Sequence, residues 1–120
     1  MLFLNRNLLL IILLAIIIFL VPSRVLSAEV LQVQSSSIIR IGDNNRSYRV
    51  KLACISIEPL KDKEATIWLK SELPRKSRVN FFPQGYEAGT LIADLISLSS
   101  NKDIGKEMNE LGFAQITCKG

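Results

Sequence analysis

Few side chains in this 120-residue chain can take part in chemistry, and their types limit what the protein can do. Histidine is absent, which excludes Ser-His-Asp and Cys-His nucleophilic catalysis and every metal site built on histidine. The two cysteines, Cys54 and Cys118, are too few to hold a zinc ion alone. Carboxylate-and-metal chemistry, binding without chemistry, and a structural role therefore remain open.

The aspartates that a hard metal ion would need are spread along the chain. Asp62 and Asp103 stand at the start of helix-like segments. Asp43 lies in a turn-like segment and Asp94 in a strand-like one. No pattern brings two of these carboxylates together, so we expect no metal site of clustered acids.

Basic residues offer the other candidate site, a surface that follows a phosphate backbone, with an exposed tyrosine as a platform for a stacked base. The candidates for contact with nucleic acid are Arg40, Arg49, Lys51, Arg78 and Tyr86. The formal net charge is +4 for the chain and +2 once Arg6 and Arg24 are set aside. This mild excess permits an anionic partner without requiring one, and an ordinary solvated surface is the competing interpretation.

Residues 1–28 have the layout of a secretory signal, with a charged start, an apolar middle and an end of small residues. Arg6 precedes an apolar block over residues 8–21. Cleavage after Ser27 suits a signal peptidase better than cleavage after Ala28, because a smaller residue then occupies the third position before the cut. We therefore expect the mature protein to begin directly after one of these two residues.

Export would leave one domain, residues 29–120, in the periplasm or the medium. A domain of this length supplies one small hydrophobic core and no second one. The competing interpretation keeps residues 8–21 as a membrane anchor. A helix over that block spans roughly 21 Å, short of a hydrocarbon core about 30 Å thick, so we favour cleavage.

The exported part alternates short strand-like and helix-like patterns. Alternating apolar side chains predict strands over residues 29–33, 38–41, 48–55, 78–82, 90–96 and 113–117. Turn residues at 42–45 and 83–85 separate neighbouring strands. Helical spacing predicts a helix over residues 62–73, and a second helix capped within 99–101 and closed by Gly112. Many short strands in one small domain predict a closed β-barrel, which leaves no exposed edge, with helices over its open ends.

Four stretches, in this order, resemble the staphylococcal nuclease-like (thermonuclease) family. They are RVKLACIS at residues 49–56, KEA at 63–65, LIADL at 91–95 and the segment 108–114. The first resembles the family's V-R-L-x-G-I-D strand and the last its M-V-x-x-G-x-A ending. The resemblance spans Val30 to Ile116 and implies an OB-fold, a five-stranded β-barrel with two or three helices.

The resemblance also implies where a catalytic site would lie. Members of that family hold a calcium ion with two aspartates, place a glutamate beside the attacking water, and grip the phosphodiester with two arginines. The matching positions in this chain are Ser37, Lys51, Ser56, Glu58 and Ala88. Serine hydroxyls bring no negative charge to offset the dehydration of calcium, and lysine lacks the planar fork of arginine. We therefore expect no calcium ion and no other cofactor.

The expected function is binding rather than catalysis, because the developing charge on the phosphate loses its main stabilisation. The leading hypothesis is an exported, inactive nuclease homologue, a monomer, that binds single-stranded nucleic acid or a protein partner. The alternative is a divergent nuclease that hydrolyses DNA or RNA at a displaced site. Contact with a membrane is expected only if the first segment stays uncleaved.

The two cysteines are expected to pair. In the resembling family the short final strand lies beside the end of the strand that matches residues 49–56, which implies that Cys118 lies near Cys54. Export would place both cysteines where a disulfide persists. The alternative is a buried free thiol at Cys54 and an unpaired Cys118.

Overall fold

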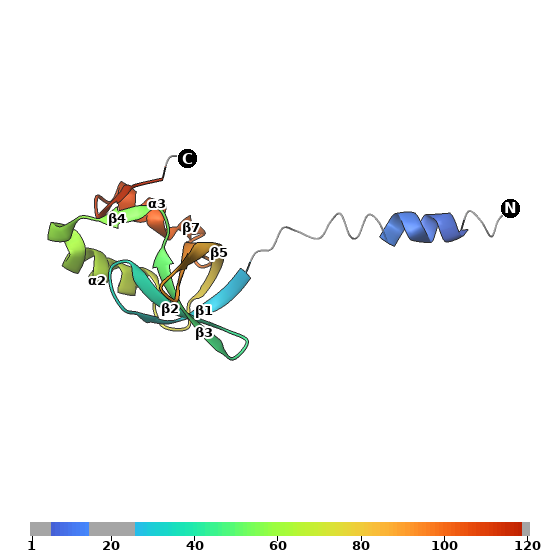
Figure 1. Cartoon of the computed structure of the whole chain (residues 1–120), viewed down its shortest axis with the longest axis horizontal. Coiled ribbons are helices and arrows are strands. Elements are labelled where there is room, and N and C mark those ends of the chain that lie inside the picture. The colour runs from blue at the N-terminus through green and yellow to red at the C-terminus, as the bar shows by residue number, and fades with distance from the viewer. Residues whose placement is uncertain (1–5, 15–25, 119–120) are drawn as a thin grey trace.

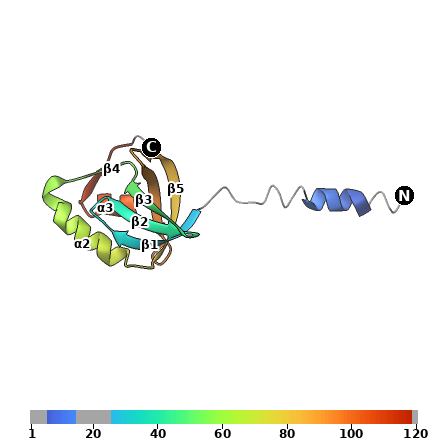
Figure 2. The same cartoon turned by 60° about the horizontal axis from the view of Figure 1, so that its bottom comes forward.

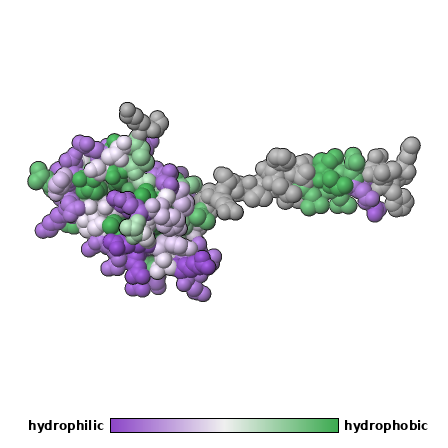
Figure 3. All heavy atoms as spheres, viewed as in Figure 1, coloured by the Kyte–Doolittle hydropathy of each residue, from purple (hydrophilic) through white to green (hydrophobic). Residues whose placement is uncertain are grey.

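The computed structural model describes residues 6–14 and 26–118 of the chain (Figure 1). Residues 6–14 form a helix, and its apolar side chains from Leu8 to Leu14 are each 47–65% exposed. Figure 3 shows this apolar surface in contrast to the mixed surface of the barrel. The rest of the predicted apolar block and the residues before the expected cut, 15–25, lie outside the described residues. Within the described ranges, no helix is long and apolar enough to cross a membrane.

Five strands close into a barrel, which confirms the predicted β-barrel with helices. They are β1 (Leu26–Val33), β2 (Ile38–Asp43), β3 (Arg46–Leu52), β5 (Arg78–Glu87) and β6 (Thr90–Ser97). The order β3-β2-β1-β5-β6 is antiparallel throughout, and a parallel pairing of β3 with β6 joins the two ends. This mixed and closed arrangement is that of an OB-fold-like barrel.

Shorter elements surround the barrel. β4 (Ile55–Ile57) and β8 (Ala114–Ile116) form a separate antiparallel pair, and β7 (Lys102–Asp103) extends the sheet from β6. The helices of this part are η1 (Pro59–Lys61), α2 (Asp62–Glu72) and α3 (Ile104–Glu110). Figure 2 shows α2 beside β1, while α3 lies against β6 and β8. The two α-helices thus cover parts of the barrel strands that would otherwise be exposed to solvent.

The inward faces of the strands and helices share one core. Every second residue of β6 is buried, as the alternating pattern predicts. Ala65 and Leu69 of α2 are fully buried, and so are Ile104 and Met108 of α3. Each pair is four residues apart and therefore lies on one face of its helix. All four side chains belong to the same apolar cluster as the strand residues.

The strand predicted over residues 48–55 is shorter in the structure. β3 ends at Leu52, and the backbone of Cys54 is left-handed, with a φ of 61°. Such a conformation interrupts a strand, because an extended backbone has a negative φ. The chain turns at this point and continues as β4.

The turn predicted at residues 83–85 is wrong. β5 continues through Pro83 with a shift in its register to β6, and the hairpin turns at Ala88 and Gly89, which both have positive φ. The extra residue is Gln84, and a proline is tolerated beside such a bulge, because the hydrogen-bonded ladder is disrupted there. The proline therefore marks a bulge and not the end of the strand.

Both helices begin at or next to an aspartate, and the second helix does not have its predicted cap. Asp62 is the first residue of α2, and its carboxylate accepts a hydrogen bond from the buried hydroxyl of Ser36. The second helix is capped by Asp103, whose Oδ1 accepts a hydrogen bond from the Lys106 N–H at 3.2 Å. The cap predicted within 99–101 is wrong, because β7 pairs with β6 before the helix begins.

Candidate functional site

Three basic side chains gather on the outer face of β2 and β3. Arg49 and Lys51 point outward from β3 because alternate residues, such as Val50, point into the core. Arg40 points outward from β2 for the same reason, and all three basic side chains are exposed. We call Arg40, Arg49 and Lys51 the basic face.

The two arginines of the basic face stand directly opposite each other. The register of β2 and β3 pairs Arg40 with Arg49, and like charges in such a pair destabilise a sheet. Arg40 Nη2 also donates a hydrogen bond to Ser47 Oγ at 3.3 Å. The ion pairs of the described residues are Lys61–Glu64, Arg78–Glu29 and Lys102–Glu107. No described acid therefore forms an ion pair with the basic face.

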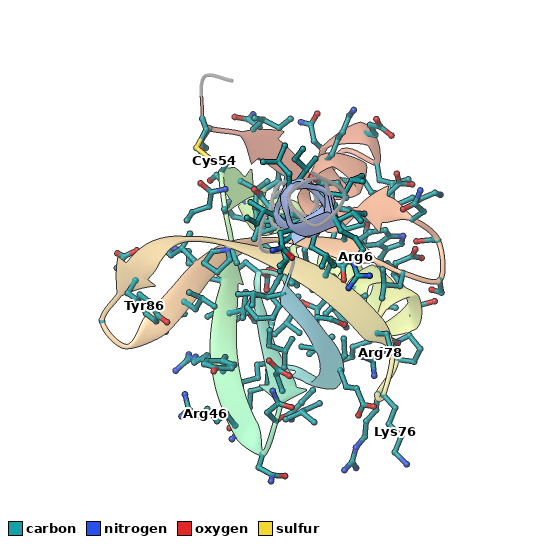
Figure 4. All side chains as sticks on the ribbon, turned by 90° about the vertical axis from the view of Figure 1, so that its right-hand side faces the viewer. Arg6, Arg46, Cys54, Lys76, Arg78 and Tyr86 are labelled. Carbon is teal, nitrogen blue, oxygen red and sulfur yellow. A yellow bond between two sulfur atoms is a disulfide. The ribbon has the colours of Figure 1, made fainter. Side chains whose placement is uncertain are left out.

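The other two candidates for nucleic-acid contact lie away from this face. Arg78 Nη1 lies 3.6 Å from Glu29 Oε1, and Arg78 Nη2 donates a hydrogen bond to Ser27 Oγ at 3.2 Å. Tyr86 is 72% exposed and pairs with the buried Leu91, so it belongs to the inward side of a projecting hairpin. Figure 4 shows Arg78 and Tyr86 on opposite sides of the barrel. The structure therefore brings three of the five candidates together.

Two of the positions that match the family's catalytic site are neighbours. Ser37 precedes β2, and its carbonyl oxygen accepts a hydrogen bond from the Leu52 N–H at 2.9 Å. Lys51 is adjacent, because it pairs with Ile38 in the β2–β3 register. The two positions are therefore neighbours in the backbone where β2 begins and β3 ends.

The other three matching positions bring no clustered acids. Ser56 is exposed on β4, opposite Gln115 of β8. Glu58 follows β4, half-buried, and its N–H donates a hydrogen bond to the Phe113 carbonyl at 2.9 Å. Ala88 lies in the exposed turn between β5 and β6. Among the described residues, no group of three or more Cys, Asp or Glu side chains could hold a metal ion.

A second charged region, absent from the sequence-based candidates, lies between β6 and α3. Asp94, Asp103 and Lys106 line a hollow of about 240 Å³ beside Cys54. We call it the acidic hollow. The expectation that no two aspartates lie together is wrong for this pair, because β7 pairs Asp103 with Ile96, two residues from Asp94. The sequence signal for this hairpin is the run of turn-forming residues Ser99, Ser100 and Asn101.

The two carboxylates of the acidic hollow accept hydrogen bonds from other residues of the domain. Burial raises the pKa of the Asp94 carboxyl above its usual range, a hydrogen bond from Gln84 Nε2 at 2.8 Å lowers it, and the charge of Asp103 raises it further. Asp103 itself caps α3. Both carboxylates therefore have a hydrogen-bond partner within the fold.

Cys54 and Cys118 form a disulfide at the edge of the acidic hollow (Figure 4). Their Cα atoms are 4.9 Å apart, within the usual range for a bridge. The Thr117 N–H donates a hydrogen bond to the Cys54 carbonyl at 2.9 Å, which holds the two segments side by side. The structure therefore shows the paired state and not the free-thiol alternative.

Comparisons with known proteins assign no family. A scan against protein-family models finds no match to the chain, and a search of curated proteins finds none either. The fold defines the protein as an OB-fold-like β-barrel with helices, and the basic face is its candidate binding site.

Proposed function

We propose that this protein is an exported, inactive homologue of the staphylococcal nuclease-like family that binds single-stranded nucleic acid on its basic face. One observation carries the proposal: Arg40 and Arg49 face each other on exposed strands, and no described acid pairs with them. A phosphate between two guanidinium groups would turn their repulsion into attraction.

The shape and charge of the basic face suit an extended strand. OB-fold barrels bind oligonucleotides on the face of their second and third strands, which here is the face that carries the three cations. Arginine forks match phosphate oxygens in a bidentate manner, and Lys51 adds a point charge. With three phosphate contacts, the logarithm of the affinity should fall with the logarithm of the salt concentration with a slope of about −2.

The lack of catalysis follows from the resemblance and from donor chemistry. Ser37 and Ser56 stand where the family has carboxylates for calcium, and Ala88 stands where it has an arginine. Without metal and arginine, the charge that develops on the phosphate in hydrolysis is left without its main stabilisation. We expect no calcium-stimulated cleavage of DNA or RNA above a buffer control.

A divergent nuclease with a displaced site is the alternative, and the acidic hollow is the observation that favours it. Asp94 and Asp103 supply carboxylates there, beside the ammonium group of Lys106. Chelator-sensitive cleavage by the purified protein that Asp94→Asn abolishes would establish this alternative and overturn the proposed inactive state.

Export is supported by the disulfide, because disulfides persist outside the cytoplasm. β1 begins at Leu26, and Ala28 is 3% exposed and paired with Val79. Cleavage after Ser27 keeps Ala28 in the strand, whereas cleavage after Ala28 removes a buried residue. We therefore expect Ala28 to be the first residue of the native protein, which mass analysis of its N-terminus checks. A native chain that still begins at Met1 would contradict export.

Fluorescence anisotropy with a labelled DNA strand of about 12 nucleotides tests the binding proposal. We expect Arg49→Ala to weaken binding several-fold and Arg40→Ala/Arg49→Ala to weaken it at least about tenfold. Lys63→Ala is the matched control, because it removes one exposed positive charge from α2, outside the basic face. Equal losses in Arg49→Ala and Lys63→Ala would show that only net charge matters and would contradict a site on the basic face.

A further inference from the structure

β1 carries an irregularity beside the basic face. Its register with β2 shifts between Val30 and Gln32, so Leu31 is an extra residue, as in a β-bulge. Leu31 and Gln32 are consequently both exposed. A Cβ atom on Gly42 of β2 would lie 3.2 Å from Leu31 Cδ1, so the glycine lets the leucine lie across the neighbouring strand.

Beside this bulge, a hollow of about 280 Å³ lies between β1 and the end of α2, two elements that run side by side in Figure 2. We call it the bulge hollow. Its apolar wall consists of Leu31, Val33, Leu73 and Pro74. Its polar rim consists of Gln32, Lys70 and Arg75, and the ion pairs of the described residues involve none of these three. The bulge hollow thus combines apolar surface with an amide and two positive charges.

The bulge hollow continues the basic face. Gln32 pairs with Arg40, which pairs with Arg49, so these side chains form one row across β1, β2 and β3. Neighbouring strands are about 4.8 Å apart, which makes the row roughly 10 Å long. A ligand that follows the row therefore reaches the bulge hollow.

We propose that the bulge hollow seats one base of the bound strand, with adenine preferred, and that Lys70 and Arg75 hold the phosphate beside it. This rests on the proposed function, because a nucleic-acid strand supplies base and phosphate together. The volume of about 280 Å³ is slightly below the range of about 300–1,000 Å³ for ligand pockets, so only a small group such as a single base fits. The apolar wall covers the faces of the base, and the Gln32 amide both donates to and accepts from the edge of adenine.

Substitutions on the rim test the phosphate contacts. With the processed protein and a labelled oligonucleotide, we expect Lys70→Ala/Arg75→Ala to lower the affinity about tenfold. Lys63→Ala, on the same helix, should leave the affinity within about twofold. Circular dichroism and a thermal melt of each variant show whether it is folded.

A series of oligonucleotides tests the seat for the base without any substitution. A single abasic site is moved along the strand, and one position should lower the affinity at least about fivefold, because a seated base loses its contacts. At that position, adenine should bind better than the other three bases. Gln32→Leu should erase this preference while the abasic effect remains.

The outcomes separate this inference from the proposed function. If the wild-type protein binds no oligonucleotide, both the proposed function and the seat for a base in the bulge hollow are overturned. If Arg49→Ala weakens binding while Lys70→Ala/Arg75→Ala and every abasic position leave it unchanged, only the bulge hollow is overturned. If the double variant is unfolded, the abasic series on the wild-type protein decides.

Discussion

The basic face and the acidic hollow belong to the same barrel, yet their charges have different surroundings. In the acidic hollow, Asp94 accepts a hydrogen bond from Gln84, and Asp103 caps α3. On the basic face, Arg40 and Arg49 oppose each other, and no described acid forms an ion pair with either. The carboxylates therefore have partners within the fold, whereas each arginine has a repulsive neighbour.

This difference separates charged groups that have a partner within the fold from charged groups that face a like charge. Removing a charge that caps a helix should weaken the fold, because backbone N–H groups lose an acceptor. Removing one of two opposed arginines should strengthen the fold and weaken binding, because the repulsion disappears together with the phosphate contact. Stability and binding should therefore change in opposite ways on the basic face.

The largest effect is expected from the disulfide at the edge of the acidic hollow. Cys54→Ser/Cys118→Ser opens a loop whose ends are 64 residues apart, which should lower the free energy of unfolding by about 4 kcal/mol. Urea unfolding with and without reductant measures this loss, and the affinity for nucleic acid of the folded variant should be unchanged. Two alkylated thiols in the unreduced native protein would rule the bridge out.

The helix cap gives the next effect. Asp103→Ala removes the acceptor of the Lys106 N–H, which should lower the free energy of unfolding by about 1 kcal/mol. Asp103→Asn is the control, because its amide oxygen can still cap the helix. Its free energy of unfolding should fall much less than that of Asp103→Ala. Thermal melts of the two variants compare them, and equal losses would mean that charge and not capping matters at this position.

The basic face should respond in the opposite direction. Arg49→Glu turns the repulsive pair with Arg40 into an attractive one, which should raise the free energy of unfolding by about 0.5 kcal/mol while binding of nucleic acid is lost. Urea melts and anisotropy on the same sample measure both changes. A variant that is less stable and still binds would break the distinction between the two regions.

The smallest effect concerns Asp94 and depends on pH. Its pKa is raised chiefly by burial, so the folded state binds this proton more tightly than the unfolded chain does. The free energy of unfolding therefore falls as pH rises from the usual carboxyl range through the raised pKa, and Asp94→Asn removes this loss. We expect Asp94→Asn to raise the free energy of unfolding at neutral pH and to leave it unchanged in acid, where the carboxyl is protonated in both states, as measured by urea melts. A gain that persists in acid would show a cause other than titration.

The candidate site could be predicted only in part. The exposed arginines were visible as residue types on strand-like segments, but their opposition depends on register. The left-handed turn at Asn44 and Asn45 sets that register, because two turn residues place Asp43 opposite Arg46 and, three steps further, Arg40 opposite Arg49. A two-residue turn at Asn44 and Asn45 therefore predicts that Arg40 pairs with Arg49.

The sequence by itself determined the local elements. The spacing of Ala65 and Leu69 specifies a helix with one buried face, and the alternation in β6 specifies a strand with one buried face, because both periods are properties of the backbone alone. The apolar block over residues 8–21 is recognised in the sequence for a similar reason, since it is defined by its composition alone.

Only the tertiary structure decided which segments that are distant in the sequence pair and pack against each other. The pairing of β3 with β6 closes the barrel, and β7 brings Asp103 to the vicinity of Asp94. The register shift between β1 and β2 that exposes Leu31 depends on the pairing of these two strands. The bulge hollow forms only where α2 lies beside this register shift. These features result from contacts between segments far apart in the chain, whose free energies depend on packing in three dimensions and not on any local pattern of residues.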